Sequence, residues 1–146
     1  MTLRVYFDSS AVMKLIRDEP CSADVERWMR DESVEAVAGM LTETEVRRAT
    51  ERHGLSQDDA TAALGHLAMF GHPDWEFKAA GVMPGGSLRS LDALHVAAAL
   101  RIEADALITY DDRMAEAAVA MGLAVIQPGV GDREGESRTS GSLDGR

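Results

Sequence analysis

The chain has 146 residues, of which 45% are hydrophobic, and this length and composition predict one globular domain with a substantial core. No run approaches the roughly 18 apolar residues of a membrane span, and the N-terminus lacks the pattern of a secretion signal. With one cysteine, Cys21, the chain can form neither an internal disulfide nor a zinc site built on thiolates, and we expect a cytoplasmic location. The formal net charge of −10 repels nucleic acid at long range, so a nucleic-acid substrate would require a local basic patch or a metal ion.

The first segment predicts a strand that ends in a carboxylate. Residues 5–7 are β-branched or aromatic, and Asp8 follows them directly. Ser9 and Ser10 can cap a helix that we expect over residues 11–17. Asp8 therefore lies at the carboxyl end of a strand, where open α/β sheets bind ligands, although an Asp in this position can also serve as a helix cap alone.

Short strands alternate with amphipathic helices along the rest of the chain. Further strands are expected over residues 34–38, 106–109 and 124–126. Helices are expected over residues 22–30, 42–53, 58–70, 88–100 and 112–121. This alternation predicts the α/β class, with a parallel sheet of about four to five strands. The domain is expected to span residues 1–128, and the polar residues 129–146 are expected to form a disordered tail.

The acids that open the helix expected over residues 42–53 have two explanations. Thr42 and Glu45 have the spacing of a capping box, in which the glutamate accepts a hydrogen bond from a free backbone N–H. Glu45 also follows a strand and precedes Arg47 and Arg48, a local basic ridge on an acidic chain. That ridge suits a solvated helix face as well as a phosphate-binding face.

The helix that follows the Pro-Gly-Gly break carries an acid and a histidine one turn apart. Ser90 is its expected N-cap, and Asp92 lies in its first turn, where the helix dipole stabilises a negative charge by about 0.3–1 kcal/mol. We predict that His95 is packed or hydrogen-bonded rather than a ligand or a general base. The other histidines share no spacing and are expected on the surface or in loops: His53, His66 and His72.

Acids directly follow three of the expected strands. They are Asp8, the pair Glu43 and Glu45, and the pair Asp111 and Asp112. Because these positions lie at one edge of a parallel sheet, the carboxylates would raise each other's pKa unless a cation lay between them. Mg²⁺ and Mn²⁺ prefer such oxygens, and a bound ion can polarise a phosphate and activate water. Asp92 begins a helix, so this geometry does not place it at the edge.

Four segments resemble PIN-domain nucleases, and specifically the VapC-type toxins of toxin–antitoxin pairs. They are residues 6–15, 41–49, 88–99 and 107–113. The resemblance extends in order from about residue 3 to residue 128. It implies a PIN-like α/β/α sandwich and an endoribonuclease, a hydrolase of RNA phosphodiester bonds that depends on Mg²⁺ or Mn²⁺. The same resemblance implies which residues are catalytic and bind the metal: Asp8, Glu45, Asp92 and Asp111.

Within each pair of acids, the family pattern selects one. Glu45 is chosen over Glu43 because it precedes the stretch Val-Arg-Arg-Ala, and Asp111 is chosen over Asp112 because it completes Thr-Tyr-Asp. Supporting roles near the carboxylates or a bound water are implied for Ser9, Thr109 and Asp112. The arginines implied to steer the phosphate backbone are Arg47, Arg48 and Arg89.

The resemblance also implies partners and leaves two alternatives. The partners are an RNA substrate, a VapB-like antitoxin that occludes the site, and a second copy of the chain in a homodimer, with no membrane. One alternative is a catalytically silent PIN-like binding module, against which the presence of all four acids argues. The other is an aspartate-based phosphotransfer protein, which is disfavoured because Asp8 begins no Asp-x-Asp and no lysine follows a later strand.

Overall fold

A computed structural model describes residues 2–131, and within them five strands form one all-parallel sheet in the order β3-β2-β1-β4-β5. The strands are β1 (Leu3–Phe7), β2 (Val34–Gly39), β3 (Ala68–Phe70), β4 (Ala106–Ile108) and β5 (Ala124–Ile126). The α/β class and the parallel sheet predicted from the sequence are therefore confirmed. Most of the tail expected over residues 129–146 lies outside the described residues.

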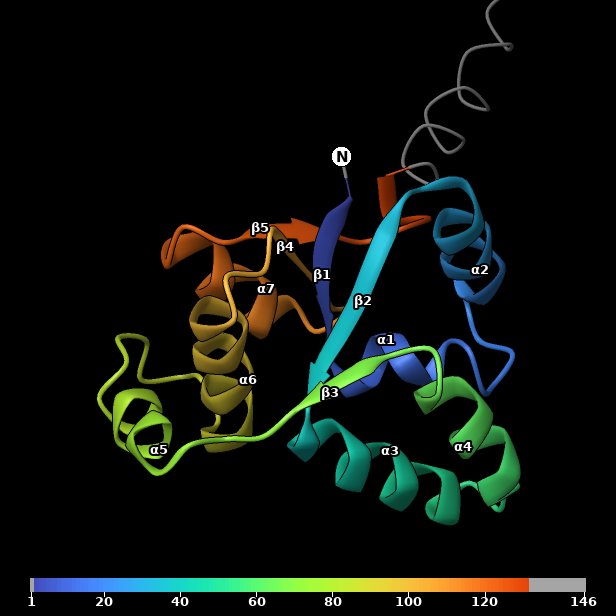
Figure 1. Cartoon of the computed structure of the whole chain (residues 1–146), viewed down its shortest axis with the longest axis horizontal. Coiled ribbons are helices and arrows are strands. Elements are labelled where there is room, and N and C mark those ends of the chain that lie inside the picture. The colour runs from blue at the N-terminus through green and yellow to red at the C-terminus, as the bar shows by residue number, and fades with distance from the viewer. Residues whose placement is uncertain (1, 132–146) are drawn as a thin grey trace, which may run out of the picture.

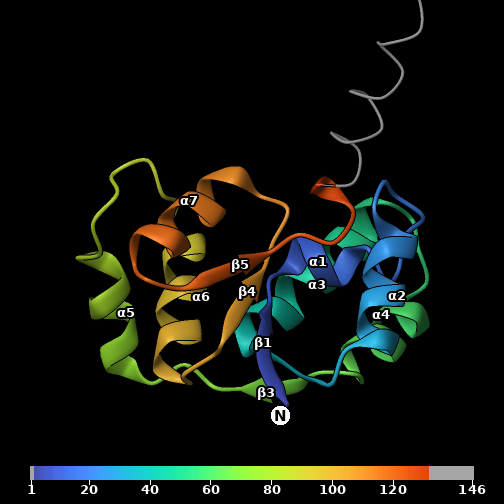
Figure 2. The ribbon, with the colours of Figure 1, turned by 90° about the horizontal axis from the view of Figure 1, so that it is seen from above.

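Helices cover both faces of this sheet. They are α1 (Ser9–Met13), α2 (Ser22–Asp31), α3 (Met40–Arg52), α4 (Gln57–Leu64), α5 (Asp74–Gly81), α6 (Ser90–Arg101) and α7 (Asp112–Ala120). Helices α1 to α4 lie on one face and α5 to α7 on the other, which Figures 1 and 2 show from two directions. The layers form the expected α/β/α sandwich. Across residues 2–131, no helix has the length and apolar character that crossing a membrane requires.

The alternation of side chains along β1 supplies both layers of the core. Phe7 packs into the core beneath α1 to α4, together with Val12 and Val46. Tyr6 points the other way, into the core shared with α6 and α7, where it meets Val96. Because both faces of a parallel sheet are covered, its strands are mostly apolar, and among the buried residues of β1 only Tyr6 carries a polar group.

The helix expected over residues 58–70 is shorter than predicted. Ser56 caps it, accepting from the backbone N–H of Asp58 at 3.1 Å, but α4 ends at Leu64. After a turn, β3 pairs in parallel with the end of β2, with Ala68 opposite Val37. The prediction was wrong here because a short apolar run after a helix has the same hydrophobic pattern in a buried strand as in a continuing helix.

Helices α3 and α6, like α1, begin elsewhere than predicted. The N-cap of α3 is Gly39, and no side chain caps this helix, so the expected capping box between Thr42 and Glu45 does not form. Similarly, α6 has Arg89 rather than Ser90 as its N-cap, again without a side-chain cap. The carboxylate of Glu45 is therefore available for other partners.

Candidate active site

Neighbouring strands bring acids to one edge of the sheet. Asp8 follows β1 and Asp111 lies just beyond β4, and these strands are paired, with Phe7 opposite Ile108. On the other side of β1, the strand β2 leads directly into α3, which carries Glu45.

Helix α6 brings Asp92 to the same edge because it runs antiparallel to the strands. At the end of α6, the carbonyl of Ile102 accepts a hydrogen bond from the guanidinium of Arg4, at the start of β1, at 2.8 Å. The opposite end of α6, with Asp92 in its first turn, therefore lies toward the carboxyl ends of the strands. This tertiary contact supplies the position that the sequence pattern alone left open.

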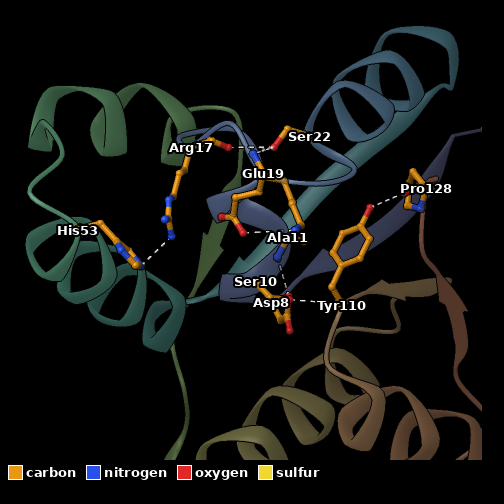
Figure 3. Close-up of polar contacts among 10 residues, drawn as sticks. Asp8, Ser10, Ala11, Arg17, Glu19, Ser22, His53, Tyr110 and Pro128 are labelled. Carbon is orange, nitrogen blue, oxygen red and sulfur yellow. Dashed lines mark hydrogen bonds and ion pairs between the residues drawn. The ribbon is translucent and has the colours of Figure 1, made fainter. Parts of the chain in front are cut away.

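Asp8 is buried, and both of its carboxylate oxygens accept hydrogen bonds. Its Oδ1 accepts from the hydroxyl of Ser10 at 2.7 Å and from the N–H of Ala11 at 3.0 Å, and its Oδ2 accepts from Thr109 Oγ1 at 2.5 Å. Ser10 in turn accepts from the N–H of Tyr110, as Figure 3 shows. Burial raises the pKa of Asp8, and the hydrogen bonds from Thr109, Ser10 and Ala11 oppose this rise. Asp8 thus caps α1 and is also fixed against the end of β4.

Glu45 is held from two sides. Its Oε1 contacts Nε2 of His95, which is fully buried, and its Oε2 accepts from the hydroxyl of Ser9 at 3.3 Å. The other ring nitrogen of His95, Nδ1, lies 2.7 Å from the hydroxyl of Tyr6. His95 is therefore packed and hydrogen-bonded, as predicted. Tyr6 was not among the predicted site residues, and its signal was a hydroxyl among the buried apolar residues of β1.

Asp92 and Asp111 influence each other electrostatically. Burial raises the pKa of half-buried Asp92, and the charges of Asp111 and Glu45 raise it further, whereas Arg89 acts in the opposite direction. Asp111 caps α7 by accepting from two backbone N–H groups at 2.9 and 3.1 Å. Asp112, the neighbouring acid, is exposed in the first turn of α7. Carboxylates from three separate elements therefore share one negative environment.

The arginines of α3 point to different places. Arg47 faces α4, and its guanidinium donates to Glu43 at 2.8 Å, Gln57 at 3.3 Å and Thr61 at 3.2 Å. Arg48 and Arg52 instead line a cavity of about 520 Å³ that also includes Glu45. Of the arginines that the resemblance implied for phosphate steering, Arg48 lines this cavity, and Arg52 joins it there.

A second polar cluster supports the start of α3. His72 lies in a loop, as predicted, but its side chain is only 9% exposed. Its Nε2 accepts a hydrogen bond from the N–H of Leu41 at 3.2 Å. Its Nδ1 donates to fully buried Glu76 at 2.7 Å, and Glu76 also accepts from Arg101 of α6. This cluster ties α5 and α6 to the first turn of α3.

The chemistry of the acids fits a hydrated divalent cation. Across residues 2–131, no three His, Cys, Asp or Glu side chains are close enough to enclose a metal ion. Mg²⁺ does not require such a cage, because it keeps several waters and binds through one or two carboxylates. A cation would also relieve the repulsion that raises the pKa of Asp92. The donor set therefore fits Mg²⁺ or Mn²⁺ with part of its water shell.

The chain is thus an α/β/α sandwich with acids gathered at the carboxyl edge of its parallel sheet. The model of the PIN domain family matches residues 5–120, and the chain belongs to this family. Ribonuclease VapC46 of Mycobacterium tuberculosis is 40% identical over 127 residues, which cover 85% of this chain and 97% of that relative. Within the family, the chain is thus a VapC-type ribonuclease, the toxin class expected from the sequence.

Solved structures agree with the fold at much lower identity. The crystal structure of VapC20 from Mycobacterium tuberculosis, a toxin that cleaves the sarcin–ricin loop, matches with a TM-score of 0.67 and 11% identity, over 77% of this chain and 94% of that one. A toxin–antitoxin complex from Klebsiella pneumoniae matches with a TM-score of 0.60 and 16% identity, over 76% and 89% of the two chains.

Proposed function

We propose that this ribonuclease hydrolyses RNA phosphodiester bonds with Mg²⁺ or Mn²⁺, which four acids hold either directly or through the waters that the ion retains. The four acids are Asp8, Glu45, Asp92 and Asp111. The observation that supports this most strongly is that paired strands and the antiparallel helix α6 bring these acids to one edge of the sheet. Burial is the largest cause of the raised pKa of Asp92, and the charges of Asp111 and Glu45, from two other elements, raise it further. Negative groups that gather at one sheet edge are the oxygen ligands that these ions prefer.

The bound ion supplies Lewis acidity toward a phosphate oxygen and lowers the pKa of water. The side chains around it have separable roles. Hydrogen bonds from Ser10 and Thr109 favour the ionised form of Asp8, which burial disfavours. The hydroxyl of Ser9 donates to Glu45, so both serines beside Asp8 act as donors to carboxylates. Water, rather than a side chain, is then the nucleophile, and no covalent enzyme intermediate forms.

Partners and boundaries follow from the same proposal. The solved toxin–antitoxin complex from Klebsiella pneumoniae supports an antitoxin as a partner, and we propose that this antitoxin is VapB-like and covers the acidic edge. The net charge of −10 complements a basic antitoxin segment. We further propose that the toxin forms a homodimer in the cytoplasm and that its nuclease domain spans residues 1–128, which includes the matched range 5–120.

We expect purified protein to cleave RNA in Mn²⁺ and to stop when the metal is removed with EDTA. Excess Mn²⁺ should restore cleavage, because the acids bind the ion reversibly. Mapping of the 5′ ends of RNA from the native source would identify the cleaved bond. Cleavage that continues in EDTA would contradict the role of the metal, and a protein that binds Mn²⁺ in calorimetry without cleaving any RNA would be a silent binding module.

The double substitution Arg48→Ala and Arg52→Ala is expected to raise KM for RNA and to leave kcat nearly unchanged. Both side chains line the cavity beside Glu45, where they would contact phosphates rather than the reacting bond. The logarithm of the RNA affinity falls linearly with the logarithm of the salt concentration, and each phosphate contact contributes about 0.7 to the steepness of that slope. Losing two contacts should therefore make the slope shallower by about twice this amount. The measurement is a titration with a short RNA at several salt concentrations.

The matched control for the double substitution of Arg48 and Arg52 removes the same two positive charges from another helix. Arg27 and Arg30 are surface arginines of α2, and replacing both with alanine should leave KM and the salt dependence unchanged. Arg47→Ala should lower stability through its lost contacts with α4 but should not raise KM. An equal rise in KM for the α2 pair would show that overall charge, not the cavity, attracts RNA.

A further inference from the structure

A chain of hydrogen bonds connects the backbone of β2 with Glu45. The N–H of Gly39 donates to the hydroxyl of Tyr6 at 3.1 Å, and that hydroxyl lies 2.7 Å from Nδ1 of His95. Nε2 on the other side of the ring contacts Oε1 of Glu45. Tyr6 and His95 are fully buried, so the connection runs through the core beneath α6 and not over the surface.

The backbone donor at one end fixes the direction of the first bond in this chain. The N–H of Gly39 can only donate, so the oxygen of Tyr6 accepts from it, and we infer that Tyr6 directs its own proton to Nδ1 of His95. The imidazole then carries its proton on Nε2, where it donates to Glu45.

The two partners of Glu45 each belong to a segment that carries another acid. His95 lies one turn after Asp92 on α6, and it holds Oε1. Ser9 directly follows Asp8, and it holds Oε2 from the other side. Glu45 is therefore fixed relative to both Asp8 and Asp92, which lie on elements far apart in the sequence.

The packing around Tyr6 leaves little room for another arrangement. A Cβ on Gly39 would lie 2.8 Å from the hydroxyl of Tyr6 and 2.5 Å from Nε2 of His72. Residue 39 must therefore lack a side chain for its N–H to reach Tyr6 in this position. Tyr6 itself lies in β1, between β2 and β4 in the middle of the sheet, where it has little freedom to move.

We propose that Tyr6 and His95 form a positioning pair that fixes the carboxylate of Glu45 against Asp8 and Asp92 for binding of the divalent cation. The proposal rests on the proposed function, in which Glu45 is a metal ligand. Tyr6 and His95 touch neither the ion nor the RNA, and they act through Glu45. Partners that orient metal ligands in this way typically contribute 10–100-fold in metal affinity or activity.

The test compares substitutions that break this chain with one that keeps its last bond. Tyr6→Phe removes only the hydroxyl, and His95→Leu removes both ring nitrogens. Each is expected to weaken Mn²⁺ binding by about 10–100-fold in calorimetry and to lower kcat, with KM for RNA nearly unchanged. His95→Gln places an amide donor near the position of Nε2 and is expected to restore most of the Mn²⁺ affinity.

The matched control is Tyr110→Phe. Tyr110, the other tyrosine, is partly buried, and its hydroxyl donates to the carbonyl of Pro128 at 2.7 Å instead of to the acidic site. This substitution should cost stability without weakening Mn²⁺ binding. Nuclear magnetic resonance of the histidine ring nitrogens, recorded without metal, gives a second readout: the wild-type protein should show His95 with its proton on Nε2, and Tyr6→Phe should lose this preference.

Each result has a defined meaning. Wild-type Mn²⁺ affinity in folded Tyr6→Phe and His95→Leu, beside lost affinity in Asp92→Asn, would overturn the positioning pair and leave the proposed function standing. A wild-type protein that binds no Mn²⁺ would overturn both. Should the disruptive variants fail to fold, a wild-type His95 that carries its proton on Nδ1 would by itself refute the proposed direction of the chain.

Discussion

Asp92→Asn is expected to slow RNA cleavage by at least about 100-fold, because a lost metal ligand should cost no less than the 10–100-fold typical of the partners of ligands. The fold should survive this change. The pKa of Asp92 is raised by burial and by the charges of Asp111 and Glu45, so the ionised side chain is held in an unfavourable environment. Removing its charge relieves that repulsion, and thermal unfolding without metal should occur at the same temperature or higher. Cleavage rates and Mn²⁺ calorimetry of the same preparation are the measurements.

Asp58→Asn is the matched control for this experiment. Asp58 also lies in the first turn of a helix, α4, and the substitution makes the same change in net charge. It should leave both the cleavage rate and Mn²⁺ binding unchanged. Cleavage by Asp92→Asn at the wild-type rate would remove Asp92 from the proposed site, whatever its position at the sheet edge.

The strand-end acids were predictable from local pattern, and Asp92 was not. Asp8 and Asp111 follow apolar runs, so a parallel sheet places them at a common edge. Asp92 begins a helix, and its position depends on the direction of α6, which the contact between Arg4 and Ile102 records. That contact joins residues 98 positions apart in the sequence, and short-range periodicity carries no information about it.

Local rules also predicted a contact that tertiary structure replaces. The spacing of Thr42 and Glu45 matches a capping box, but α3 begins at Met40, directly after β2. The glutamate is instead held by Ser9 and His95, from α1 and α6. Glu45 matches a local capping motif but contacts residues distant in the sequence, because the end of β2 sets where α3 begins.

Asp8→Asn is expected to abolish cleavage and, without divalent cations, to stabilise the fold at neutral pH. Burial raises the pKa of Asp8 despite its three hydrogen bonds, so the ionised carboxylate costs stability. Asparagine can keep the acceptor that Ser10 and Ala11 use, and its amide can donate to Thr109 Oγ1. The loss of charge should therefore cost little in packing. The measurements are RNA cleavage and urea unfolding in EDTA.

The pH dependence gives this expectation a definite sign. The folded state keeps a proton on Asp8 up to a higher pH than the unfolded state does, so it binds more protons between the two pKa values. The free energy of unfolding therefore falls as pH rises through this window, by about 1.4 kcal/mol for each unit by which the pKa is raised. Asp8→Asn should not show this loss, and its advantage over the wild-type protein should grow with pH and then level off above the raised pKa of Asp8.

With Mn²⁺ present, we expect the wild-type protein to be more stable than Asp8→Asn, the reverse of the order expected in EDTA. This reversal separates the structural role of Asp8 from its role as a metal ligand. Mn²⁺ binds the folded wild-type protein and should raise its unfolding temperature, whereas Asp8→Asn should respond weakly. Asp18→Asn, an exposed change of the same charge, should follow the wild-type protein in every condition. A variant less stable than the wild-type protein in EDTA at neutral pH would mean that the hydrogen bonds to Asp8 outweigh the cost of its burial. Asp8 would then hold α1 to β4 as well as bind the ion.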